Sequence, residues 1–318
     1  MFMEKQIDYS PDAVHLKKKR FMDRSNWELV FLALPAVILL FIFNYLPMAG
    51  IVIAFQDFKP IQGILGSAWV GFENFEFFFT SVDALRTIRN TLLYSLAFLV
   101  LDLITAVALA LMFYFLRSRI ALKTYNTIVI LPKFMSAVLI AYLAYGFLNP
   151  NYGLFNQVLE IFGKEPIQWY AESKYWIFIL SFLHIWAMVG MNSVIFYSTL
   201  MGMDETMLEA ASIDGANLGR KIWHIIIPFL KQIMIVTTIL NIGHIFNGDF
   251  GLFYQVPQDV GLLYPTTDII STYSYRALQE GSLARSTAVG LFQSVAGFIM
   301  VILTNLIVKK ISPDDSLF

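Results

Sequence analysis

The sequence predicts an all-α, polytopic membrane protein with six transmembrane helices and both termini in the cytoplasm. Hydrophobic residues make up 58% of the 318 residues and charged residues only 14%, well below the roughly one-quarter charged content of soluble domains. Six apolar runs reach the roughly 20 residues that a helix needs to cross a bilayer. They lie near residues 27–55, 90–116, 125–148, 174–200, 224–248 and 286–308. A soluble bundle is the alternative, but covering six such segments would need a far larger protein.

The positions of Lys and Arg predict the orientation, because short cytoplasmic loops carry the excess of these residues. Counted with the N-terminus inside, fourteen of the 22 Lys and Arg lie on or near the cytoplasmic side, including the cluster 17–20. Seven fall outside, and Lys133 lies within the third apolar run. The first run is too long for the core of a secretory signal, so we expect it to remain as a span. The protein is therefore expected to be multi-pass in a membrane.

No linker or repeat divides the apolar part of the chain, which predicts one six-span domain over residues 27–310. A cytoplasmic segment, 1–26, precedes it, and a cytoplasmic tail, 311–318, follows it. The three outer connections cover about 56–89, 149–173 and 249–285, where Gly, Pro and Asn indicate turns. The fourth and fifth spans are joined by a polar cytoplasmic loop, 201–224.

This cytoplasmic loop contains the most informative segment of the chain, Glu-Ala-Ala-Ser-Ile-Asp-Gly-Ala at 209–216. Asp204 can cap a helix ahead of it and Gly215 can end that helix, which predicts a helix–turn–helix. Glu209 and Asp214 can accept charge-assisted hydrogen bonds from a basic partner. The chain has no G-x-x-x-x-G-K-[ST] loop to bind nucleotide phosphates, so any ATP hydrolysis is expected on another polypeptide.

Further landmarks appear in order along the chain. They are Gly-Phe-Glu-Asn-Phe at 71–75, Asn-Thr-Leu at 90–92, Leu-Pro at 131–132, Tyr-Gly-Leu-Phe-Asn at 152–156 and Ile-Pro at 227–228. With the loop segment, they make the whole chain resemble the maltose-type permeases of carbohydrate ABC importers. Residues 44–58 and 315–318 most resemble the subgroup for polysaccharide or complex-oligosaccharide uptake. Two departures affect the loop: a Leu-Pro-x-x-x-Pro ending is common in the family, whereas this chain has Ile227-Pro228 and then Gln232, and Asp204 stands where Pro is usual.

The resemblance implies a type I ABC importer permease of the bacterial inner membrane that works by alternating access. Its partners would be a second, related permease chain, two ATPase subunits, an extracytoplasmic solute-binding protein, a carbohydrate substrate and membrane lipids, with no nucleic acid. ATP and Mg²⁺ would bind the ATPase subunits, and this chain would hold no cofactor. The residues that match the family's ATPase-docking motif are Glu209, Ala210, Ala211, Asp214 and Gly215.

Polar side chains inside the spans are the candidates for a substrate pathway, because such residues usually face the bundle interior or a water-filled cavity. In the fourth span His184 and Asn192 share a helical face, as do Asn241 and His244 in the fifth. Trp186 and Tyr145 offer aromatic faces for stacking on sugar rings. The alternative is interhelical hydrogen bonding, worth about 1 kcal/mol per contact.

Asp102 also lies inside a span, where it could pair with Lys133. An ion-coupled transporter would use Asp102 and His244 to carry protons, and it remains an alternative together with an ABC permease for a non-sugar solute. A membrane enzyme acting on lipid-linked sugars is a third. No catalytic triad, carboxylate pair or metal-ligand spacing supports an enzyme, and the four His residues are scattered.

Overall fold

The structure, a computed structural model, describes residues 24–311. The predicted cytoplasmic segments 1–26 and 311–318 therefore lie almost entirely outside the described residues. The chain divides at Gly50 and Ile51 into two compact units. The described part of the first unit begins with α1 (Arg24–Leu40), which continues through η1 (Phe41–Tyr45) into η2 (Leu46–Phe55), and η2 runs across the division between the units. Its apolar stretch Leu29–Phe55 is long enough to cross a membrane.

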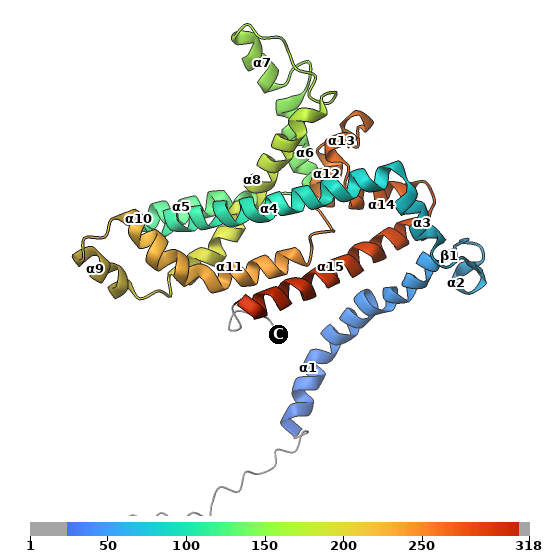
Figure 1. The fold of residues 1–318 in the computed structure, drawn as a ribbon, viewed down its shortest axis with the longest axis horizontal. Helices are drawn as coiled ribbons and strands as arrows, with labels where there is room; N and C mark the ends of the chain where they lie inside the picture. Colours follow the sequence, from blue (N-terminus) through green and yellow to red (C-terminus); the bar gives the residue numbers. More distant parts are fainter. Residues whose placement is uncertain (1–23, 312–318) are drawn as a thin grey trace, which may run out of the picture. The chain divides into compact units, whose positions relative to one another are not determined.

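The second unit contains four further helices of membrane-spanning length and composition, all drawn in Figure 1. Two are single long helices, α4 (Val82–Tyr114) and α15 (Leu283–Ile311). The third is α8 (Trp176–Leu200), preceded by η4 (Ser173–Tyr175). The fourth runs through α10 (Leu218–Lys221), η5 (Ile222–Ile226) and α11 (Ile227–Ile242).

The third predicted span is broken. Its first part is α5 (Arg119–Ile130) with η3 (Leu131–Phe134), its second part is α6 (Ala137–Leu148), and the two are bent by 100°. Pro132 interrupts the first part because it lacks an N–H group, and the Ser136 side chain caps α6 by accepting a hydrogen bond from the N–H of Leu139. The described residues thus contain five candidate spans, or six if the bent pair is counted as one.

The core of the second unit forms where α8 packs along α4. Tyr94 and Phe98 of α4 lie in one apolar cluster with Trp176 and Leu180 of α8. A second cluster joins the other ends of these helices to the start of α11, through Ala106, Ala110, Phe196, Leu200, Ile226 and Leu230. Close side-chain packing therefore holds α4 to α8 along their length and attaches the start of α11 to both.

One glycine sets the distance between α8 and α5. A Cβ atom on Gly190 would lie 2.1 Å from the carbonyl oxygen of Val129 and 2.4 Å from its carbonyl carbon. Only glycine permits this approach, and small residues at helix contacts are common within membranes. The backbones of α5 and α8 are therefore in direct contact at this point.

Short elements fill the connections. On the predicted outer side these are β1 (Gln56–Asp57) paired antiparallel with β2 (Ala68–Trp69), α2 (Gly63–Gly66), α3 (Glu73–Thr80), α7 (Leu154–Ile161), α12 (Phe250–Gln255), η6 (Gly261–Leu263), α13 (Tyr264–Thr267) and α14 (Ile270–Gln279). On the predicted cytoplasmic side, α9 (Glu205–Ile213) precedes α10.

Candidate functional site

The loop between α8 and α11 has the predicted helix–turn–helix layout. Asp204 caps α9 by accepting a hydrogen bond of 3.0 Å from the N–H of Thr206, and this bond holds the pKa of the Asp204 carboxyl below its usual range. Gly215 ends the helix with a φ of +76°, a conformation that glycine adopts without strain. Asn217 then caps α10 by accepting from the N–H of Arg220 at 2.9 Å. Local capping residues thus set both helix boundaries.

The α9 helix is attached to the spans on one face and open on the other. Leu208 packs against the apolar cluster at the start of α11. Glu209, Ala210, Asp214 and Gly215 are exposed, and Ala211 is half-buried. The exposed apolar side chains Met207 and Ile213 lie on the same short helix. Such a surface, with small residues between acidic and apolar ones, is suited to contact with another protein.

A cavity of about 500 Å³ lies behind α9. Its walls include Glu205 and Glu209 of α9, Arg117 and Arg119 from the α4–α5 connection, and Lys221 of α10. The Lys221 ammonium group donates a hydrogen bond to the hydroxyl of Ser212. The α4–α5 connection therefore borders the same space as the candidate docking helix.

A buried acid–base pair lies inside the spans. His184 Nε2 is 3.1 Å from Asp102 Oδ2, with the side chains 10% and 16% exposed. The imidazole stacks on the ring of Phe98, with centroids 3.8 Å apart and planes 8° from parallel. The predicted pairing of Asp102 with Lys133 is wrong, because α4 faces α8 at this level and presents Asp102 to His184. The Lys133 ammonium group instead lies 3.1 Å from the sulfur of Met188.

Three cavities adjoin this pair and share lining residues. One of about 170 Å³ is lined by Asp102, Asn192, Thr237 and Asn241, among others. A second, of about 390 Å³, is lined by Asp102, His184, Asn241, His244 and Asp249. The third, of about 120 Å³, shares His184, Met188 and Asp249 with the second and includes Lys133. Together they bring neutral hydrogen-bonding groups and charged groups to one region between α4, α8, α11 and α12.

The structure separates the six predicted pathway residues into two groups. His184, Asn192, Asn241 and His244 line the polar cavities. Trp186 instead lines an apolar cavity of about 580 Å³ between α6 and α8. Tyr145 packs against Tyr170, with ring centroids 5.7 Å apart. All six remain predictions as substrate contacts, and only the first four line the two adjoining polar cavities, which share Asn241. Sequence reasoning missed Asp249, although the turn Asn-Gly-Asp at 247–249, at the end of the fifth apolar run, was a usable signal.

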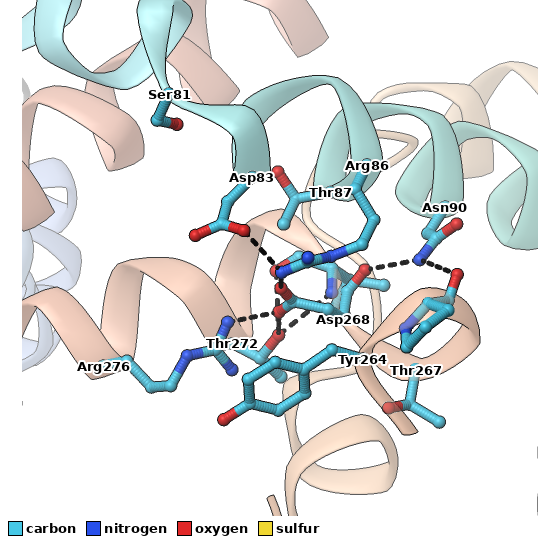
Figure 2. Close-up of polar contacts among 12 residues, drawn as sticks. Ser81, Asp83, Arg86, Thr87, Asn90, Tyr264, Thr267, Asp268, Thr272 and Arg276 are labelled. Carbon is cyan, nitrogen blue, oxygen red and sulfur yellow. Dashed lines mark hydrogen bonds and ion pairs between the residues drawn. The ribbon is translucent and has the colours of Figure 1, made fainter. Parts of the chain in front are cut away.

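An ion-pair network at the predicted outer end of α4 was also missed (Figure 2). Its centre is Asp268, whose carboxylate is fully buried. Arg86 Nη2 lies 2.6 Å from one carboxylate oxygen, and Arg276 Nη2 lies 2.5 Å from the other. At the periphery Asp83 pairs with Arg86 at 2.8 Å, and Asp259 pairs with Arg276 at 3.0 Å. We call these five residues the outer network.

Neutral groups complete the outer network. Both guanidinium groups lie over the ring of Tyr264, 5.6 and 4.3 Å from its centroid. Burial raises the pKa of the Tyr264 hydroxyl, and this hydroxyl donates a hydrogen bond to Asp259 Oδ1 at 3.1 Å. The Asn90 amide donates to the carbonyl oxygens of Pro265 and Asp268, as Figure 2 shows. The end of α4 is thus fastened to the segment between α12 and α14.

Comparison with known proteins identifies the kind of molecule that carries these features. No protein-family model matches the chain. The chain is 34% identical over 305 residues to the polygalacturonan/rhamnogalacturonan transport system permease protein YteP of Bacillus subtilis, covering 94% of each chain. This chain belongs to the carbohydrate ABC importer permeases. It is also 32% identical to protein LplB of Bacillus subtilis, over 91% of this chain and 90% of that protein.

A solved structure supports the same family for this permease. It is a bacterial ABC transporter involved in the import of the acidic polysaccharide alginate, and one of its chains matches with a TM-score of 0.81 and 30% identity. The match covers 91% of this permease and 97% of that chain. A second structure of the alginate transporter, in complex with an alginate pentasaccharide-bound periplasmic protein, matches equally well. Family membership favours ABC transport over the ion-coupled carrier and the membrane enzyme.

The landmarks of the permease family have structural roles in this chain. The Asn74 amide donates to the carbonyl oxygens of Ala54 and Gln56, both at 3.0 Å. The Asn156 side chain makes four hydrogen bonds that hold the connection after α6 together. A Cβ atom on Gly153 would lie 2.4 Å from the carbonyl oxygen of Asn149, so only glycine fits there. These landmarks therefore hold the connections between spans in place.

Among the described residues, no group of His, Cys, Asp or Glu is arranged to hold a metal ion.

Proposed function

We propose that this permease forms half of the membrane pathway of an importer for acidic oligosaccharides. The observation that carries the proposal is the row of adjoining cavities lined by Asn192, Asn241, His184 and His244. Amide and imidazole groups can donate to and accept from sugar hydroxyls. Acidic cargo is supported by the names of two relatives, the polygalacturonan/rhamnogalacturonan permease and the importer of the acidic polysaccharide alginate.

The permease does not supply its own energy in this proposal. An ATPase subunit binds the exposed face of α9 through Glu209, Ala210, Ala211, Asp214 and Gly215. Because Leu208 attaches α9 to the start of α11, a displacement of α9 is passed to that helix and hence to Asn241 at the cavity wall. The bound ATPases hold ATP and Mg²⁺ and drive alternating access.

The remaining partners follow from the same proposal. A second, related permease chain completes the pathway, and an extracytoplasmic solute-binding protein delivers the sugar at the end of α4 that carries the outer network. Both termini lie in the cytoplasm, and the membrane is the bacterial inner membrane. The positive charge of the predicted cytoplasmic loops supports this orientation.

The coupling role is tested in the assembled complex of both permeases, two ATPases and binding protein. Glu209→Lys reverses a charge on the exposed face of α9, and Gly215→Val disfavours the positive φ that ends the helix. No atom lies within 4 Å of a Cβ at Gly215, so the second change acts through conformation rather than collision. Both variants should insert normally and lose most binding-protein-stimulated ATP hydrolysis.

A matched control is Glu160→Lys, because Glu160 is an exposed glutamate on α7 at the opposite end of the spans. It should leave stimulated hydrolysis at the wild-type rate. Equal stimulated rates for Glu209→Lys and the control would reject α9 as the docking helix. Absence of sugar-stimulated hydrolysis in the wild-type complex would reject the importer itself.

A further inference from the structure

Lys133 is a charged residue near the middle of the broken span. It lies in η3, between α5 and α6, which together pass as one membrane-crossing pair. A charged side chain at membrane depth is costly and usually faces a pathway or a partner charge. A negative charge is therefore expected close to Lys133.

The described residues supply no such charge within ion-pairing distance of Lys133. Its side-chain contact is the neutral sulfur of Met188 at 3.1 Å. Asp102 is engaged by His184. Asp249 lines the same small cavity, where it keeps its charge and caps α12 by accepting from the N–H of Leu252, and it forms no ion pair with Lys133. The Lys133 side chain is exposed in this chain, so an anionic group can reach it.

A second positive feature lies beside Lys133. The break in the span places the first turn of α6 at the same cavity, which Ala137 helps to line. The N-terminus of a helix carries a partial positive charge, and this helix has 12 residues. Broken helices inside transporters commonly direct such ends towards anionic groups of the substrate. The ammonium group and the helix end therefore favour the same kind of ligand.

The position of this cavity connects it to the candidate pathway. It shares His184, Met188 and Asp249 with the cavity lined by Asn241 and His244. A sugar whose hydroxyls meet those two residues would thus have a neighbouring unit close to Lys133. We propose that Lys133, with the N-terminus of α6, binds the carboxylate of a uronic acid unit and makes the permease selective for acidic oligosaccharides. This inference rests on the proposed function and names the residue that carries its charge selectivity.

The test measures uptake of trigalacturonate by the complete complex, with its binding protein, in liposomes. Lys133→Gln removes the charge and Lys133→Arg keeps it. Because a charge-assisted hydrogen bond is about twice as strong as a neutral one, we expect uptake by Lys133→Gln to fall at least about tenfold. Lys133→Arg should retain most of the wild-type rate. Lys164→Gln, at an exposed lysine of the predicted outer connection, is the matched control and should transport normally.

Four outcomes overturn the inference. If Lys133→Gln takes up trigalacturonate at the wild-type rate, the charge of Lys133 is not used. If Lys133→Gln and Lys133→Arg lose uptake equally, Lys133 has a role in packing. If Lys133→Gln and Lys133→Met fail to co-purify with the second permease while Lys133→Arg still does so, a carboxylate of that partner neutralises Lys133. A wild-type complex that takes up no galacturonide rejects the proposed acidic cargo and the inference with it. If the wild-type complex takes up trigalacturonate and Lys133→Gln does so at the same rate, the inference is rejected and the proposed acidic cargo is not.

Discussion

The outer network allows a stability prediction to be worked from its geometry. Asp268→Asn keeps the size of the side chain and removes its charge. In the native chain the carboxylate receives hydrogen bonds from Arg86 at 2.6 Å, Arg276 at 2.5 Å and the hydroxyl of Thr272 at 2.9 Å. The substitution therefore leaves two guanidinium groups without their shared central partner.

The expected cost follows from how much of the network survives. Removing one partner of a buried ion pair costs about 3–5 kcal/mol. Arg86 keeps Asp83 and Arg276 keeps Asp259, so we expect the lower end, about 3 kcal/mol. Asp83→Asn is the matched control, because it removes a carboxylate from the same network at a side chain that is 45% exposed. Exposed pairs contribute at most about 1 kcal/mol.

The measurement is the free energy of unfolding of the purified permease, titrated with SDS in mixed micelles. Asp268→Asn should lower it by about 2 kcal/mol more than Asp83→Asn, the difference between the two estimates above. Equal losses for the two variants would refute the argument, because they would show that burial of Asp268 does not decide the strength of the pair. In that case the losses of the two single variants should add in the double variant Asp83→Asn/Asp268→Asn. A connected network instead predicts a loss that differs from their sum.

Two further predictions concern the spans. Asn241→Ala and His244→Ala should each lower the initial rate of sugar uptake about fivefold, the effect of losing one hydrogen bond of about 1 kcal/mol. Normal uptake of every accepted sugar by both variants would show that neither residue contacts the substrate. Gly190→Ala should abolish the folded, monodisperse fraction seen by size-exclusion chromatography in detergent, because its Cβ would lie 2.1 Å from a backbone oxygen. Gly290→Ala, where no atom lies within 4 Å of the added Cβ, should be tolerated, and similar behaviour of the two variants would contradict the close approach of α5 and α8.

The sequence predicted best what depends on local interactions. Apolar run length located the helices, and single capping residues such as Asp204 and Gly215 located the ends of α9. The break at Pro132 was not predicted, since the apolar run continues through it and proline is tolerated in membrane helices. It becomes visible only when Ser136 is seen to cap a new helix.

Long-range partners could not be predicted from residue type and spacing. Arg86 and Asp268 are 182 positions apart in the sequence. Nothing near either residue distinguishes Arg86 from an arginine that only helps to set the orientation in the membrane. The same reason explains why Asp102 was paired with the wrong residue. Its helical face could be predicted, but the identity of the helix opposite that face could not.

The direct contact of α8 with α5 at Gly190 has a consequence for how the permease changes shape. Two helices that touch backbone to backbone have no layer of side chains through which to slide, so we expect α5 and α8 to move as one rigid body. Because η3 packs against both α5 and α8, Lys133 should move with this body, which carries His184, and the separation of the two residues should stay constant through the transport cycle. The cavities would change volume by movement of α11 and its bound loop against this fixed wall.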